Sequence, residues 1–334
     1  MRQIRSLFAV DAHTTGTPIR IVASGIPPLA GATVTEKMED MRARHDHIRR
    51  FATCPPRAAE SLVAAVLTEP CTPGADFGLF YIDALTYQPM CGAGTFAVAK
   101  ALIETGLVAR TEPETVVRLE TPTGIVTAYA AIEGGEVAEI ALENVPAFLY
   151  RKDLEIDVPE LGALRVDIGY GGNFFTLVDA DAAGLDISPG NMAELRRLSR
   201  LILRAANAAA TVRHPVNPDV NYMDQLLYCR DTPNADGEYV CQCIFGDAQA
   251  DISPCGTGTS TRIAQRYFRG RLGLGETFRQ KSVYGGVFSG CALRETRLGD
   301  IPAVVPRIAC SDVRITAFTH LVAEADDRLA EGYA

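Results

Sequence analysis

Hydrophobic and polar positions follow two different periods along the chain, and these separate the expected strands from the expected helices. Runs of about four to eight residues that are apolar or that alternate predict strands. These runs lie at 5–10, 19–24, 77–83, 136–142, 239–245, 282–288, 302–305 and 312–318. Residues 116–120 and 125–130 predict a hairpin, and 163–178 predicts two strands joined by a kink at Gly171 and Gly172.

Longer segments with a helical period are fewer. The clearest covers 191–209, whose apolar positions fall on one face at Leu195, Leu198, Leu201, Ile202 and Ala205. Residues 33–54 predict a second helix with Thr35 as its N-cap, whereas 213–238 is rich in Pro and Asn and predicts a loop. Because most strands lie too close together for repeated strand–helix–strand units, the pattern predicts an α+β fold.

One motif occurs twice, as MCGAGT at 90–95 and as PCGTGT at 254–259. An apolar strand precedes each copy and a helical segment follows it. A glycine in the C′ position ends each helix, Gly106 after Cys91 and Gly270 after Cys255, and both intervals are 15 residues (106 − 91 and 270 − 255). Equal intervals in the two halves predict an internal duplication and therefore two pseudo-symmetric α/β domains.

The position of each cysteine suggests its chemistry. A thiol at a helix N-terminus lies at the positive end of the helix dipole, which favours the reactive thiolate. Glycines let a ligand approach the backbone, and the exposed N–H groups of the first turn can hold a carboxylate. Two such loops facing each other would suit inversion at a carbon, with one thiolate removing a proton and the opposite thiol returning one. This chemistry needs neither a metal nor a cofactor.

Composition narrows the classes of partner. The formal charge of −9 over 334 residues argues against nucleic acid and against an anionic membrane, and no apolar run is long enough to span a bilayer. With no signal peptide, we expect a cytoplasmic protein whose nine cysteines remain thiols. Cys241 and Cys243 share one face of a strand, but without a second pair we predict core thiols and no metal site.

Several segments together carry a resemblance to a known family. They are DAHTTGTP at 11–18, ADFG at 75–78, YGGNFF at 170–175, FGDAQADISPCGTGTSTR at 245–262 and GDIPAVVP at 299–306. The chain resembles the proline racemase superfamily over nearly its whole length, and within it the 4-hydroxyproline 2-epimerases most of all.

The resemblance implies roles for specific residues. Cys91 and Cys255 match the two acid/base cysteines of the family, and Asp251 matches an aspartate that contacts the substrate amine. The substrate carboxylate would be bound by backbone amides of Gly92, Ala93, Gly256 and Thr257.

Departures from the family pattern concern the substrate more than the chemistry. Ala93 stands where the family usually has histidine, and Tyr222 stands where another histidine is expected and becomes a candidate substrate contact. The implied fold is that of the proline racemase and diaminopimelate epimerase group, with the active site in the cleft between the two domains. We expect 1–128 plus 301–334 to form the domain with Cys91, and 129–300 the domain with Cys255.

The implied activity is the cofactor-independent epimerisation of trans-4-hydroxy-L-proline to cis-4-hydroxy-D-proline. Proline racemase and trans-3-hydroxy-L-proline dehydratase are the alternatives within the family, although dehydratases usually carry Thr or Ser in place of Cys91. A non-catalytic amino-acid-binding relative is a further alternative. The expected partner is a small imino acid, with no nucleic acid and no membrane, and the resemblance also implies a homodimer.

Overall fold

The computed structural model describes residues 4–59, 61–218, 220–324 and 326–333. The chain forms two compact units, unit 1 (Met1–Leu142 with Cys310–Ala334) and unit 2 (Glu143–Ala309). The boundaries expected from the sequence lie elsewhere. Position 128 falls inside strand β7 (Gly124–Glu133), which pairs without interruption with β6 (Glu114–Thr121) and so cannot be divided. Position 300 falls in the turn before β17 (Ile301–Cys310), most of which belongs to unit 2.

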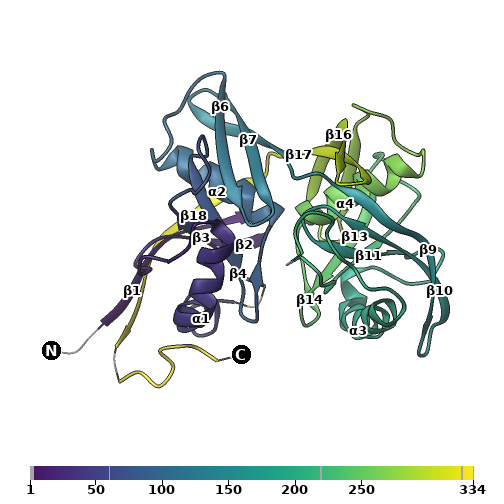
Figure 1. The fold of residues 1–334 in the computed structure, drawn as a ribbon, viewed down its shortest axis with the longest axis horizontal. Helices are drawn as coiled ribbons and strands as arrows, with labels where there is room; N and C mark the ends of the chain where they lie inside the picture. The colour runs from purple at the N-terminus through teal and green to yellow at the C-terminus, as the bar shows by residue number, and fades with distance from the viewer. Residues whose placement is uncertain (1–3, 60, 219, 325, 334) are drawn as a thin grey trace. The chain divides into compact units, whose positions relative to one another are not determined.

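Unit 1 is a mixed sheet around a central helix. Its other strands are β1 (Ile4–Thr14), β2 (Thr17–Ser24), β3 (Val63–Thr68), β4 (Phe77–Ile82), β5 (Tyr87–Gln88), β8 (Glu136–Glu143) and β18 (Val313–Glu324). The pairing runs β18–β1–β2–β3–β4–β6–β7, with parallel pairs at β2–β3 and β4–β6 and antiparallel pairs elsewhere. Helix α2 (Gly92–Glu104) packs against β1, β2, β3, β7 and β18, and α1 (Val34–Thr53) packs on β3 and β4 (Figure 1).

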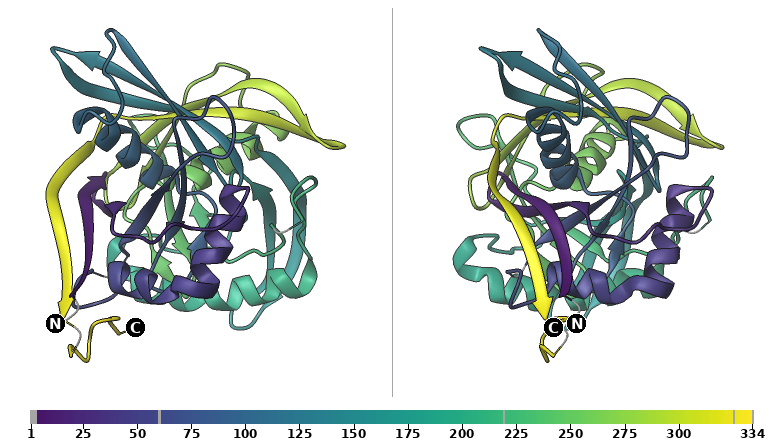
Figure 2. Two further views of the ribbon diagram at one scale, coloured as in Figure 1. Left: turned by 60° about the vertical axis from the view of Figure 1, so that its left-hand side comes forward. Right: turned by 90° about the vertical axis from the view of Figure 1, so that its left-hand side faces the viewer.

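The N-terminal strand of unit 1 depends on a partner from the other end of the chain. β1 and β18 pair antiparallel from Ile4↔Glu324 to Thr14↔Val313, and they run side by side in both views of Figure 2. The last strand thus completes the sheet that begins with the first. This pairing explains why residues after 310 belong to the unit that carries Cys91.

Unit 2 has the same order of pairs. Its strands are β9 (Phe148–Val158), β10 (Gly162–Tyr170), β11 (Phe174–Asp179), β12 (Gln225–Cys229), β13 (Tyr239–Phe245), β14 (Gln249–Ala250), β15 (Phe278–Ser282), β16 (Val287–Leu298) and β17. They pair as β9–β10–β11–β12–β13–β15–β16–β17, parallel at β11–β12 and β13–β15 and antiparallel elsewhere. Helix α4 (Gly256–Phe268) packs against β9, β10 and β16.

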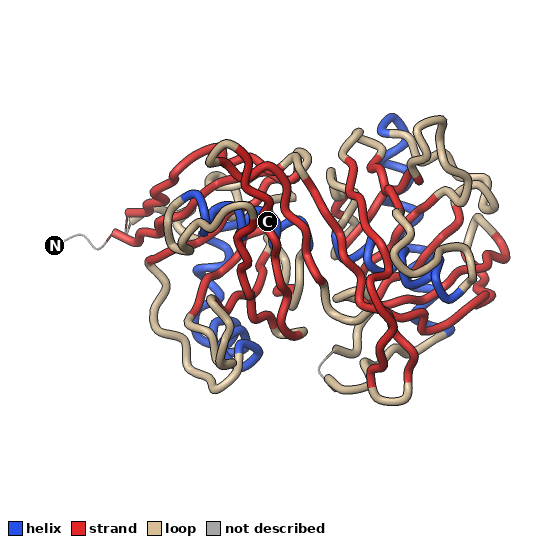
Figure 3. The backbone as a smooth tube through the Cα atoms, turned by 90° about the horizontal axis from the view of Figure 1, so that it is seen from above, coloured by secondary structure: helices blue, strands red, loops and turns tan. Residues whose placement is uncertain are grey.

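The remaining elements also correspond between the two units. β14 follows β13 as β5 follows β4, and α3 (Met192–Ala209), preceded by a 3₁₀ turn (Pro189–Asn191), lies between β11 and β12 as α1 lies between β2 and β3. Strands make up a larger part of each unit than helices do (Figure 3). The predicted internal duplication and the α+β class are therefore confirmed.

The two central helices are buried by different means. In α2 every residue from Gly92 to Ile103 except Lys100 is buried, as expected for a helix that is apolar all round. α4 is rich in Ser and Thr, yet Gly256 to Arg266 are buried. Its hydroxyls bond back to the preceding turn, Ser260 Oγ to Gly256 O at 3.0 Å and Thr261 Oγ1 to Thr257 O at 2.8 Å. Local bonding of this kind satisfies polar side chains inside the unit.

Several sequence expectations are wrong in detail. The N-cap of α1 is Thr33, whose side chain accepts from Glu36 N at 3.1 Å, rather than Thr35. The segment 282–288 is mostly the turn between β15 and β16, and the predicted loop 213–238 contains β12. β3 and β9 were not predicted. None of the helices among the described residues has both the length and the apolar character needed to span a bilayer.

Candidate active site

Cys91 is the N-cap of α2. It has extended backbone dihedrals (φ −141°, ψ 111°), and its Sγ accepts a hydrogen bond from Gly94 N at 3.3 Å. Its carbonyl oxygen accepts from both Thr95 N at 2.8 Å and Thr95 Oγ1 at 2.7 Å. The thiol is partly exposed and lies where the helix dipole favours negative charge, as predicted.

Cys255 caps α4 in the same way but in a different backbone conformation. Its Sγ accepts from Gly258 N at 3.3 Å, and its φ of +66° lies in the left-handed region that non-glycine residues rarely adopt. Ser253 Oγ accepts from Cys255 N at 3.1 Å, while Ser253 donates through both N and Oγ to Asp251 Oδ1 at 2.9 Å. This chain of bonds holds the strained residue in place.

The second glycine of each motif lies in a closely packed position. A Cβ at position 94 would lie 2.5 Å from Cε1 of the buried Tyr81 ring. A Cβ at position 258 would lie 3.2 Å from both Cβ and Sγ of Cys255. In unit 2 the bend between β10 and β11 also lies close to the backbone of α4. A Cβ at Gly171 would lie 2.5 Å from Thr257 O and Thr261 N.

The first turn of each helix can bind an anion. A helix leaves its first N–H groups without intrahelical acceptors, and these groups point outward from the N-terminus. The structure places Gly92 and Ala93 in that turn of α2, and Gly256 and Thr257 in that turn of α4. Within each unit the acid/base candidate and the predicted carboxylate-binding amides therefore lie together. Asp251 joins the unit 2 group through Ser253.

The two thiols have different neighbours, which come from equivalent strands. Tyr81 on β4 donates to Thr95 Oγ1 at 2.6 Å, since the Thr95 hydroxyl hydrogen is used toward Cys91 O. Burial and then the nearby Cys91 raise the pKa of Tyr81 well above its usual value. On β13, a hydrogen bond to Cys255 and then burial raise the pKa of Cys243 well above its usual value. Both neighbours therefore stay protonated at neutral pH.

Two of the predicted contact residues are less clearly placed. The Ala93 side chain is 2% exposed, and the Ala93 carbonyl oxygen accepts from Thr14 Oγ1 at 2.8 Å, so a substrate contact through its backbone N–H stays a prediction. Tyr222 is 41% exposed in the segment between α3 and β12. It lies near Tyr170, whose pKa is raised by burial and then by Tyr222. A substrate contact for Tyr222 stays a prediction.

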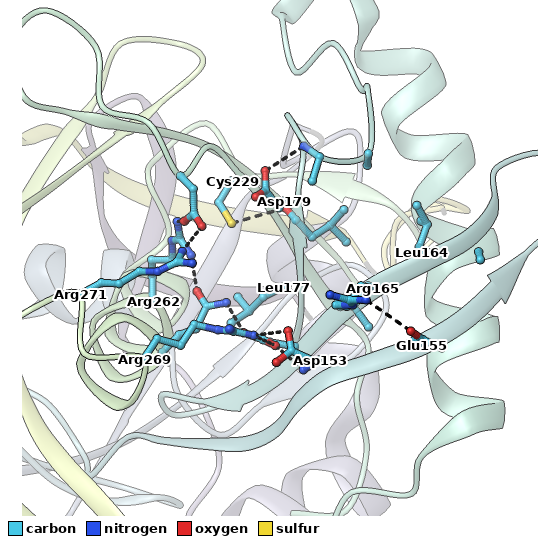
Figure 4. Close-up of a pocket in the computed structure, with 18 residues that line it drawn as sticks. Asp153, Glu155, Leu164, Arg165, Leu177, Asp179, Cys229, Arg262, Arg269 and Arg271 are labelled. Carbon is cyan, nitrogen blue, oxygen red and sulfur yellow. Dashed lines mark hydrogen bonds and ion pairs between the residues drawn. The ribbon is translucent and has the colours of Figure 1, made fainter.

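A separate cavity of about 500 Å³ opens in unit 2 beside β10, β11 and α4 (Figure 4). Its arginines already pair with carboxylates, among them Arg262 with Asp231, and Arg269 with Asp167 at 2.6 Å. Among the described residues, Cys255 is not part of the lining. Because these charges are already paired and Cys255 is not among the described lining residues, this cavity is a poor candidate for the reacting site.

Three positioning residues were not identified from the sequence, namely Tyr81, Ser253 and Gln280. Gln280 on β15 donates through Nε2 to Pro254 O at 2.9 Å and to Thr259 Oγ1 at 3.0 Å. Ser253 could have been found, because Asp-x-Ser before a helix cap is a typical side-chain-to-backbone turn. Tyr81 and Gln280 depend on strand register and leave no local signal.

Comparison with known proteins agrees with this architecture. The profile of the proline racemase family matches residues 9–334. The chain is 37% identical over 333 residues to a proline racemase of Clostridioides difficile and 36% identical to a trans-3-hydroxy-L-proline dehydratase of Burkholderia cenocepacia, in each case covering 100% of this chain and 99% of the relative. A crystal structure of a hydroxyproline epimerase from Agrobacterium vitis with bound trans-4-hydroxy-L-proline superposes with a TM-score of 0.93 at 28% identity, over 100% of this chain and 95% of the other.

The match is extensive enough to show membership of a family and not only a shared fold. Identity above one third over the full length shows common ancestry, and the predicted enzyme class, an isomerase of the racemase and epimerase type, is confirmed at that level. The relatives differ among themselves in the reactions for which they are named. The chain belongs to the proline racemase family.

Proposed function

We propose that the protein inverts the configuration at Cα of an imino acid, with Cys91 and Cys255 as the two acid/base groups. One observation supports this more than any other: each unit begins its central helix at a cysteine whose Sγ accepts from the N–H three residues later, at 3.3 Å in both. The chain thus carries two equivalent thiols on two equivalent anion-binding turns. A two-base inversion needs this pairing, and a single-base reaction does not.

The reaction then proceeds without a cofactor. One cysteine, as thiolate, takes the Cα proton, and negative charge spreads onto the substrate carboxylate. First-turn N–H groups stabilise that charge where it develops. The other cysteine, as thiol, gives its proton to the opposite face of Cα, and the two residues exchange roles for the reverse substrate.

For the substrate we propose trans-4-hydroxy-L-proline, with cis-4-hydroxy-D-proline as product. Support comes from the match over the whole chain to the epimerase structure that contains trans-4-hydroxy-L-proline. Gly94-Thr95 after Ala93 is also nearer to the epimerase motif than to the Asn-Ser of proline racemases. L-Proline is the second candidate, because the racemase relative is 37% identical.

A dehydratase is disfavoured by the cysteine at position 91. Loss of the α-proton and the β-hydroxyl needs only one strong base. In this chain the first motif keeps a thiol whose Sγ accepts the same N–H bond, at 3.3 Å, as that of the second. A second thiol of this kind is explained by inversion and not by elimination.

Proton NMR in deuterated water tests the proposal directly. Purified protein is incubated with trans-4-hydroxy-L-proline, L-proline or trans-3-hydroxy-L-proline in parallel. We expect loss of the α-proton signal and appearance of cis-4-hydroxy-D-proline in the first sample. An elimination product from the 3-hydroxy sample alone would contradict the proposal and identify a dehydratase.

Variants separate the two thiols from the other cysteines. Cys91→Ser and Cys255→Ser should each lower inversion by about 10²–10⁴-fold, the usual contribution of a general acid or base. Cys291→Ser, at a partly exposed cysteine on β16, is the matched control and should retain activity. Near-normal inversion in either active-site variant would exclude the two-base mechanism.

A further inference from the structure

Three side chains with metal-binding atoms meet in unit 2. Cys243 comes from β13, Asp251 follows β14, and Cys255 caps α4. One ligand atom of each, the two Sγ atoms and a carboxylate oxygen, lies within 4.8 Å of the other two. All three residues are buried, with exposed fractions of 0%, 8% and 7% for Cys243, Asp251 and Cys255.

We propose that Cys243, Asp251 and Cys255 form a binding site for Zn²⁺, and that the bound ion inhibits the enzyme. Tetrahedral zinc holds sulfur at about 2.3 Å and oxygen at about 2.0–2.2 Å, which places its ligand atoms about 3.5–3.8 Å apart. The three atoms lie within 4.8 Å of one another, so a contraction of about 1.3 Å at most is needed. Rotations of the side chains supply a movement of that size.

The donor set selects zinc over the commoner hard cations. Thiolates are soft ligands and zinc binds them together with carboxylate oxygens, whereas Mg²⁺ and Ca²⁺ require six or more oxygens. The surroundings are apolar: Cys243 and Cys255 belong to a core cluster that includes Phe175, Leu177 and Leu227. Three protein ligands leave the fourth position of the ion for water.

The ligands are held before any ion arrives. Asp251 is fixed by the N–H and hydroxyl of Ser253, and Cys255 by Gly258 N. Cys243 pairs with Leu227 in the interior of the sheet. Outer hydrogen bonds of this kind orient metal ligands and raise affinity.

Of the two thiols on strand β13, only Cys243 belongs to the proposed site, because the neighbouring Cys241 is engaged elsewhere. It is also fully buried in the same cluster, but its Sγ donates to Pro254 O at 3.5 Å. The pair Cys241 and Cys243, considered from the sequence, is therefore not the ligand set. Cys243 alone joins Asp251 and Cys255, which arrive from later in the chain.

Binding removes groups that the reaction uses. The two thiols release their protons to solvent and donate lone pairs to the ion, so no oxidant or reductant is required. Cys255 can then no longer accept the Cα proton, and Asp251 can no longer meet the substrate amine. Inhibition competitive with the imino acid follows, and this consequence rests on the proposed function, whereas metal binding does not.

Cobalt titration of the full-length, reduced, metal-free protein tests the site without any substrate. Thiolate-bound Co²⁺ in a tetrahedral site gives an intense charge-transfer absorption, which Zn²⁺ should remove by displacement. We expect this band to saturate at one ion per chain. Cys243→Val should weaken binding by at least about 10–100-fold, the loss seen even when an outer partner of a metal ligand is removed.

Two further variants make the result specific. Cys241→Val removes a buried thiol from the same strand and cluster and should retain the band. Cys243→Ser keeps the side-chain shape, guards against misfolding of the valine variant, and should also lose the band. Absence of the band in wild type, or an equal band in Cys243→Val, would overturn the proposal.

Kinetics then test the inhibition. Zn²⁺ should raise the apparent KM for the imino acid without changing kcat, and a chelator should restore it. Zn²⁺ inhibition with unchanged KM would overturn the competitive site. If none of the imino acids is turned over, the proposed function fails, while the cobalt titration still decides the metal site.

Discussion

Gly258→Ala should separate catalysis from stability. The added Cβ would lie 3.2 Å from Cβ and Sγ of Cys255, closer than the ordinary contact of about 3.5–4.0 Å. The added atom meets a side chain rather than backbone, so relief requires the Cys255 side chain to move by about 0.3–0.8 Å. The hydrogen bond from Gly258 N to Sγ, now 3.3 Å, is the first to lengthen.

The two energetic effects of this change nearly cancel. Alanine inside a helix is favoured over glycine by about 0.5–1 kcal/mol. Crowding at 3.2 Å belongs at the low end of the overpacking range of about 1–3 kcal/mol. The net loss is about 0–1 kcal/mol, which shifts the midpoint of thermal unfolding by no more than about 2–4 °C.

Catalysis should suffer more than stability. A displacement of about 1 Å in a reacting group can cost about 100-fold in rate, so a shift of about half that distance should cost about 10-fold. The assay pairs initial rates of imino-acid inversion, followed by polarimetry, with thermal unfolding followed by circular dichroism. We expect kcat/KM to fall about 10-fold in a protein that melts almost as wild type does.

A control at the other end of the same helix should show the opposite pattern. Gly270 has φ +67°, and a Cβ added there would meet nothing within 4 Å, so Gly270→Ala introduces left-handed strain of about 1–2 kcal/mol without touching the thiol. Its melting temperature should fall while its kcat/KM is retained. Unchanged kcat/KM in Gly258→Ala would refute the argument that the glycine sets the position of Cys255.

Further predictions concern the interior of each unit. Tyr81→Phe removes the 2.6 Å hydrogen bond to Thr95 Oγ1 and should destabilise unit 1 by about 1 kcal/mol, measured by urea unfolding. Asp167→Ala should cost about 3 kcal/mol, because it leaves Arg269 without its best-buried partner. Although burial opposes it, hydrogen bonds from Arg269, Asp153 N and Gln265 lower the pKa of Asp167. The stability it adds is therefore complete above about pH 4 and is lost as the pH falls below that value, so wild type and Asp167→Ala should converge in acid unfolding.

Local sequence rules predicted the parts of the fold that local physics determines. Each central helix follows its cysteine directly and ends at a glycine with positive φ, Gly106 at +75° and Gly270 at +67°. The start at the cysteine and the end at the glycine are both set by local geometry, so both can be read from the sequence. The missed strands have other causes: β3 is rich in alanine, and β12 is a fully buried run inside a Pro- and Asn-rich segment. Strand β9 carries register shifts and outward polar residues that hide its alternation.

The candidate site also contains residues that local sequence predicts and residues that it does not. Cys91, Cys255 and the first-turn residues beside them are contiguous, so a motif was enough to find them. Tyr81 and Cys243 lie on β4 and β13, 10 and 12 residues before their cysteines (91 − 81 and 255 − 243), and only the folded chain brings their side chains beside the helix caps. Such contacts depend on register between strands, which a single sequence does not display.

The difference between the two halves is itself informative about the proposed reaction. Exchange of roles between two bases requires two similar groups, and the duplication supplies them through the cap and the glycine three residues later. A chiral imino acid, however, presents a different face to each thiol, so identical surroundings would not suit both. The halves differ where that discrimination must arise: Cys91 is unstrained and packs near a tyrosine, whereas Cys255 is left-handed and packs near a second thiol. Because the caps are alike and the neighbours differ, replacing Tyr81 or Cys243 should change kcat unequally in the two directions. KM must then change to match, since the equilibrium constant between the two epimers is fixed, while loss of either cap should abolish inversion in both directions.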